Sequence, residues 1–145
     1  MRKAAIRFVS TLLIFIMFFL TVGCAPILRK RMREYFSKES VYVLVQGEVT
    51  RIEDNNYVLV LLRDEDAPSD WNGRTVSFLV HTDTKIEELL SVGDIIFFHT
   101  ATFMFYSGYT RPIVSIEKDG ETYLSLEEGK ENLFEFIETV DLSIF

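Results

Sequence analysis

Residues 41–62 decide the fold, and their sequence is VYVLVQGEVTRIEDNNYVLVLL. Two runs rich in β-branched and apolar residues, 41–49 and 57–62, predict two strands. Acidic residues and asparagines over 53–56 are a turn signal between them. Gly47 inside the first run indicates a bulge or a sharp bend. The stretch therefore predicts the opening hairpin of a β-rich domain.

The sequence after this hairpin predicts three more strands and two helices. Val76, Phe78 and Val80 fall on one face of the run 75–81, as in a half-buried strand. Two capping-box patterns, Thr-x-x-Glu and Ser-x-x-Glu, each predict the start of a helix. The expected elements are strands over 75–81, 94–106 and 111–117, a short helix starting at Thr84 and a final helix starting at Ser125.

Three strands, a short helix and two further strands resemble the element order of the OB-fold. The resemblance covers residues 41–118 and implies a small five-stranded, partly open Greek-key barrel. The expected fold class is all-β dominated, with a short helix between strands three and four. Residues 119–145 are expected to form a C-terminal helical extension that packs on the barrel. Another small β-barrel or a β-sandwich is the alternative, since periodicity does not reveal strand pairing.

The amino-terminal segment has the pattern of an export signal. Basic residues precede an uncharged apolar run over 8–22, which ends at Gly23 and the sole cysteine, Cys24. Residues 20–24, Leu-Thr-Val-Gly-Cys, resemble the lipobox of bacterial lipoproteins. The resemblance implies that residues 1–23 are a signal peptide, that cleavage precedes Cys24, and that Cys24 carries the lipid.

An uncleaved membrane anchor is the alternative for the same segment. No charge occurs over residues 8–28, and about 20 apolar residues suffice to span a bilayer. In either case the expected location is the cell membrane, with the domain on its extracytoplasmic face. The anchor would also permit a cytoplasmic domain, because both flanks of the apolar run are basic.

A basic stalk over residues 24–40 is expected to join this anchor to the domain. Arg29, Lys30, Arg31 and Arg33 form a dense cluster beside apolar residues at near-helical spacing. That pattern is typical of a helix on a membrane surface, where basic residues meet anionic lipid heads. A flexible tether is the alternative.

Charge and motif content restrict the function of the domain. Residues 40–145 hold seven basic and 20 acidic residues, a net charge of −13. Such a domain repels phosphate backbones, which argues against general nucleic-acid binding. No common nucleotide-binding, hydrolase or zinc motif occurs, so we expect no catalytic residue, metal or cofactor. His81 is expected to face solvent, and His99 to be a core or interface histidine.

Aromatic residues supply the candidate binding site. Tyr106 and Tyr109 lie around the expected turn between strands four and five, beside Arg111, and Trp71 lies in the loop after strand two. In OB-folds, ligands bind at the face of strands two and three and at the loops joining strands one to two and four to five, and Tyr and Trp present an apolar ring with a polar edge. The alternative is that these rings only pack the domain.

The sequence thus predicts a membrane-anchored, non-catalytic binding module whose partner is an envelope protein, a glycan or a small ligand. A single-stranded nucleic-acid binder, which would need a local basic groove, and an envelope hydrolase are the alternatives.

Overall fold

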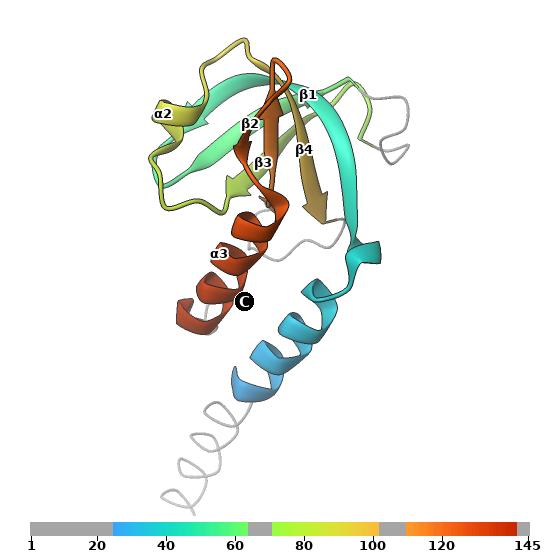
Figure 1. The fold of residues 1–145 in the computed structure, drawn as a ribbon, viewed down its shortest axis with the longest axis vertical. Helices are drawn as coiled ribbons and strands as arrows, with labels where there is room; N and C mark the ends of the chain where they lie inside the picture. Colours follow the sequence, from blue (N-terminus) through green and yellow to red (C-terminus); the bar gives the residue numbers. More distant parts are fainter. Residues whose placement is uncertain (1–24, 64–70, 102–109, 142–145) are drawn as a thin grey trace, which may run out of the picture.

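Five strands form a closed barrel in a computed structural model, which describes residues 25–63, 71–101 and 110–141 (Figure 1). The strand order is β1-β2-β3-β5-β4, and β4 returns to pair with β1. Neighbouring barrel strands are antiparallel except for β3 and β5, which are parallel. The barrel strands are β1 (Tyr42–Glu53), β2 (Tyr57–Leu62), β3 (Thr75–Val80), β4 (Ile95–Ala101) and β5 (Arg111–Ile113).

The predicted OB-like barrel, with a short helix before β4 and a helix at the carboxyl end, is confirmed, except that the barrel is closed by the β1–β4 pairing rather than partly open. The helices of the domain are α2 (Ile86–Leu89) and α3 (Leu126–Thr139), and a short 3-10 helix, η1 (Glu39–Val41), precedes β1. Two outer strands, β6 (Ile116–Lys118) and β7 (Glu121–Leu124), extend the sheet beyond β4.

Strand β1 closes the barrel because it is long enough to pair with both β2 and β4. Gly47 faces Leu62 on one side and Ile96 on the other. A Cβ atom at Gly47 would lie 2.3 Å from the Cγ1 atom of Val60, so glycine permits this close approach. The irregularity in the β1–β2 ladder lies farther along, between Val49 and Arg51.

The turn between β1 and β2 has the conformation that its sequence predicts. Asn55 and Asn56 both adopt positive φ, at 61° and 63°, and asparagine tolerates this region better than most residues. The Asn56 side chain also receives a hydrogen bond from the backbone N–H of Ile86. The turn therefore holds the first residue of α2.

Two details of the predicted elements are wrong. The expected capping box at Thr84 does not form: α2 starts after Lys85 without a side-chain cap, since Asn56 accepts the bond from Ile86. The expected strand over 111–117 divides into β5 and β6, which pair with different parts of β4. The sequence pattern also did not predict β7, which pairs with β6 across a turn at Asp119 and Gly120, both at positive φ.

The predicted cap of the final helix is confirmed. The Ser125 hydroxyl accepts a hydrogen bond from the Glu128 backbone N–H at 3.2 Å. Leu133 and Ile137 of α3 are fully buried. The helix approaches the barrel closely, because a Cβ atom at Gly129 would lie 2.0 Å from the Val114 carbonyl oxygen.

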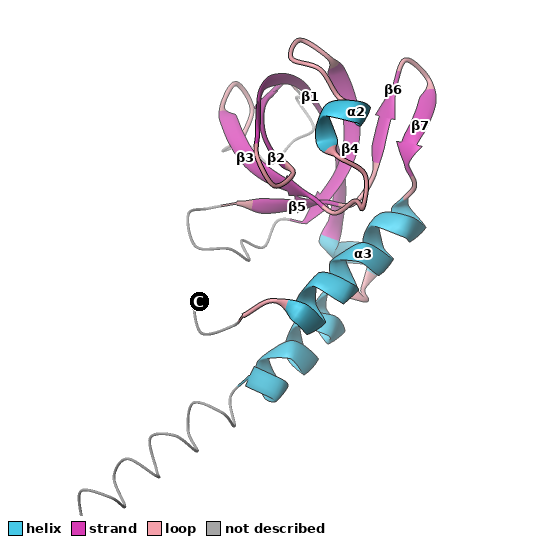
Figure 2. Ribbon diagram, turned by 90° about the vertical axis from the view of Figure 1, so that its left-hand side faces the viewer, coloured by secondary structure: helices cyan, strands magenta, loops and turns pink. Residues whose placement is uncertain are grey.

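The core has two parts. The barrel interior is filled by residues such as Phe78 and Phe98, whose rings meet edge to face at 5.0 Å. A second cluster lies at the base, where a helix over residues 25–36 runs beside α3 (Figures 1 and 2). Met32 and Phe36 of this 25–36 helix pack there with Leu133 of α3. The 25–36 helix and α3 thus pack together against one end of the barrel, and we call this pair of helices the two-helix base.

Candidate functional site

Two of the predicted ligand residues contact each other inside the domain. The guanidinium carbon of Arg111 lies 4.2 Å from the centroid of the Trp71 ring, a cation–π geometry. Trp71 is only 4% exposed and belongs to the barrel core. The pair fastens the loop before β3 to β5, so in this conformation the indole offers little surface to a ligand.

The other two predicted ligand residues, Tyr106 and Tyr109, lie outside the described residues, as does the lipidation residue, Cys24. A ligand role for Trp71, Tyr106, Tyr109 and Arg111 stays a prediction, as does lipidation.

The basic residues of the stalk lie on the 25–36 helix, and two of them turn toward α3. Arg29 donates hydrogen bonds to the carbonyl oxygens of Ile137 (3.0 Å) and Val140 (2.7 Å). Arg33 forms an ion pair of 2.8 Å with Glu138. Arg29 thus satisfies carbonyls at the end of α3, where the helix dipole favours a cation.

The remaining basic residues of the cluster face outward. Lys30 forms only a long, exposed contact of 3.8 Å with Glu34, and Arg31 is exposed. Ile27 and Leu28 are exposed on the same helix. A membrane-surface role for Arg29, Lys30, Arg31 and Arg33 stays a prediction, and the structure leaves Lys30 and Arg31 best placed for it.

A groove of about 430 Å³ lies between α3 and one end of the barrel. His81 lines it, packs edge to face on Phe136 at 5.2 Å, and has a carbonyl that accepts a hydrogen bond from Asn132. The groove is lined by Asn55, Asn56, Tyr57, Leu79, Val80, His81, Thr82, Asp83, Asn132, Glu135, Phe136 and Thr139.

The expectation that His81 faces solvent is wrong. The residue is 5% exposed, and burial lowers the pKa of its imidazole to about 3. It ends an alternating strand, where a polar residue normally meets water. Here α3 covers the strand end, and the sequence does not show where α3 docks. His99 is half-buried on the outward side of β4, and its Nδ1 lies 2.8 Å from the Ser115 hydroxyl. It belongs to neither core cluster of the described residues, and a place at an interface stays a prediction.

An exposed apolar surface on the outside of β1 and β4 was not predicted from the sequence. Leu44, Ile95 and Phe97 are 52%, 43% and 44% exposed, on the outside of β1 and β4. The signal was present in the strict alternation of β4, where Ile96 and Phe98 are buried and their neighbours must point outward. We call the outward side of β1, β4 and β6 around these three residues the outer face.

Within the described ranges no three metal-ligating side chains gather. The helices of that part of the chain are also too short or too polar to cross a membrane. Comparison of the sequence with protein-family models and with curated proteins found no match.

Proposed function

We propose that this chain is a membrane-anchored, non-catalytic binding module on the extracytoplasmic face of a cell membrane, attached through a lipid on Cys24. The proposal for the anchor is supported by the basic, apolar and small-residue pattern that ends at Cys24. The barrel is the binding element, and its partner is a protein, a glycan or a small ligand.

The observation that carries the proposal is the attachment of the 25–36 helix to α3. This helix directly follows the apolar segment in sequence, and Arg29 binds the carboxyl end of α3. The apolar packing of Met32 and Phe36 against Leu133 reinforces the contact. A tether with this contact would hold the barrel at a fixed height and orientation above a membrane, with its outer face available to a partner.

The experiment is a comparison of the full chain with Cys24→Ser, each expressed in a bacterial host that processes lipoproteins. We expect incorporation of labelled fatty acid into the wild-type chain and a mature amino terminus at Cys24, detected by mass spectrometry. Cys24→Ser should lose the label and be released or mis-processed.

Two outcomes would contradict the lipid anchor. Membrane-bound Cys24→Ser protein of unchanged mass, with an unlabelled wild type, would replace the lipid by a spanning helix. Recovery of unlabelled wild-type chain in the soluble fraction would remove membrane attachment altogether. Protease added to intact cells or spheroplasts distinguishes an extracytoplasmic from a cytoplasmic domain, with a known cytoplasmic protein as control.

A further inference from the structure

The outer face combines exposed apolar side chains with carboxylates in a regular arrangement. In the β1–β4 ladder Glu48 lies opposite Ile95, and in the β4–β6 pairing Glu117 lies opposite Phe97. Leu44 lies one row from Phe97 on the neighbouring strand, within reach of a diagonal contact. Single exposed apolar residues are common, but three neighbours on one sheet face form a continuous patch, which is typical of an interaction site.

The outer face is only weakly negative, because Glu48 is paired with Arg63 and the nearby Glu39 with Lys130. The carboxylates of Glu117 and Glu39 both act to raise the pKa of His99, against the larger effect of burial, which lowers it. Among the described residues no ion pair forms with Glu117. Glu48 is already paired with Arg63 at 2.8 Å, so Glu117 is the carboxylate that this face leaves for a cation. Cations of a partner would be attracted to the same surface.

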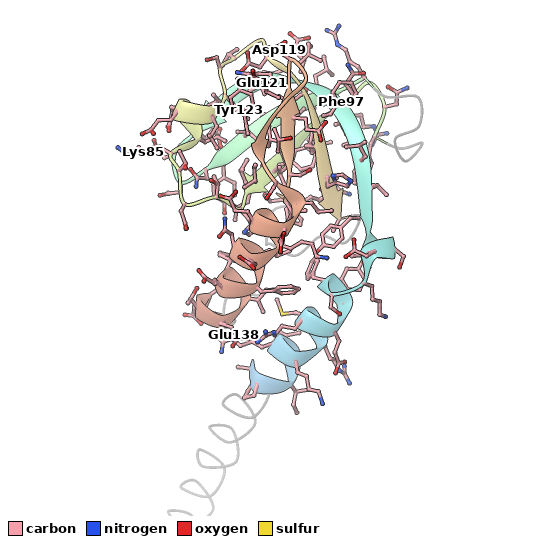
Figure 3. The ribbon with its side chains drawn as sticks, in the orientation of Figure 1. Lys85, Phe97, Asp119, Glu121, Tyr123 and Glu138 are labelled. Atoms are coloured by element: carbon pink, nitrogen blue, oxygen red, sulfur yellow. The ribbon has the colours of Figure 1, made fainter. Side chains whose placement is uncertain are left out.

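The spacing of the patch suits a helix. Same-face positions on a strand, such as Ile95 and Phe97, are about 6.6–6.8 Å apart, and side chains four apart on a helix are separated by about 5–6 Å. An apolar stripe at this helical spacing can therefore contact Leu44, Phe97 and Ile95 together, while a flanking Lys or Arg side chain reaches Glu117. Figure 3 labels Phe97 beside β4.

From these observations we infer that the outer face binds a basic amphipathic helix of a partner protein. The inference rests on the proposed role as a binding module and names the class of partner. It does not depend on the lipid, because none of the residues involved belongs to the anchor or to the two-helix base. An anionic membrane surface is disfavoured as the occupant, since Glu117 and the net charge of −13 over residues 40–145 would be repelled by it.

The test is a titration of the full-length chain, held in phosphatidylcholine nanodiscs, with a fluorescent amphipathic peptide of about 18 residues made of Leu and Lys. Empty nanodiscs provide the blank, and a Leu/Glu peptide of the same pattern controls for apolar binding alone. Phe97→Ser should weaken binding by about tenfold or more. Glu117→Gln should weaken it less and reduce its dependence on salt.

The matched control is Val92→Ser, which removes an exposed apolar residue in the turn between α2 and β4. It should bind the Leu/Lys peptide as the wild type does. Equal affinities for wild type and Phe97→Ser, or no binding by the wild type above the blank, would overturn the inference. So would self-association of the wild type that Phe97→Ser abolishes, because the occupant would then be a second copy. Membrane fractionation decides the anchor separately.

Discussion

His81 should make the stability of the domain depend on pH in the range from 7 to 5. Burial beneath α3 lowers the pKa of His81 from 6.5 to about 3. In the unfolded chain the imidazole returns to its ordinary value, so only the unfolded state takes up a proton between these two values. Stability is therefore fully present above pH 6.5 and is lost as the pH falls toward 3.

The magnitude follows from this difference. Because the pKa of His81 in the folded chain lies well below 5, the loss of stability between pH 7 and pH 5 depends only on proton uptake by His81 in the unfolded chain. That loss is about 2 kcal/mol, since each full pH unit is worth about 1.4 kcal/mol. His99, whose pKa burial also lowers, adds a contribution of the same sign, so a variant is needed to separate the two residues.

The assay is urea unfolding of the full chain in a non-ionic detergent at pH 7 and pH 5. The single tryptophan, Trp71, is buried in the barrel core and reports unfolding by its fluorescence. His81→Leu should reduce the stability loss between the two pH values by about 2 kcal/mol, whatever its effect at pH 7. His99→Gln is the matched control and should retain the His81 contribution. An identical pH dependence in wild type and His81→Leu would refute the reasoning.

Three further predictions concern the two-helix base and are measured by the same unfolding assay at pH 7. Gly129→Ala should destabilise the chain by about 1–2 kcal/mol, because overpacking against the Val114 backbone outweighs the gain in helix propensity; a stabilised variant would contradict the close packing of α3. Ser125→Ala should cost about 1 kcal/mol through loss of the amino-terminal cap, and an unchanged stability would show that the cap contributes nothing. Arg29→Ala should lower the free energy of unfolding by about 1–3 kcal/mol and speed hydrogen exchange in the last turn of α3. Its control, Lys30→Ala, should change stability by less than about 0.5 kcal/mol. Equal effects of the two substitutions would contradict the role of the Arg29 hydrogen bonds at the end of α3.

The features that the sequence predicted correctly are local ones. The strand at 57–62, the asparagine turn and the Ser125 cap each depend on a few neighbouring residues, whose backbone preferences point to the same structure. Gly47 also carried a usable signal, although its role is close packing of two strands rather than the irregularity in the ladder, which lies at 49–51. Element order then sufficed for the barrel, because short connections leave few topologies open.

The features that the sequence missed depend on where distant segments meet. His81 was expected to face solvent because it is a polar residue at the end of an alternating strand. It is buried because α3 docks over that end of the strand. Trp71 looked like a surface aromatic in a polar loop, and its burial requires Arg111 of β5 to lie over the ring. The residues that neighbour His81 and Trp71 in sequence do not indicate either contact.

Arg29 shows most clearly why such contacts escape a sequence analysis. Its partners are the backbone carbonyls of Ile137 and Val140, and a carbonyl is present at every residue, so no complementary side chain signals the pairing. In sequence, nothing distinguishes Arg29 from Lys30 and Arg31, and all three were predicted to contact anionic lipid. In the structure, Lys30 and Arg31 face outward and Arg29 does not. The four-residue cluster is therefore divided: Arg29 and Arg33 bind α3, whereas Lys30 and Arg31 are exposed, and a membrane role stays a prediction. A basic cluster beside an apolar segment should be divided in this way, by helix face, before its charges are assigned to lipid.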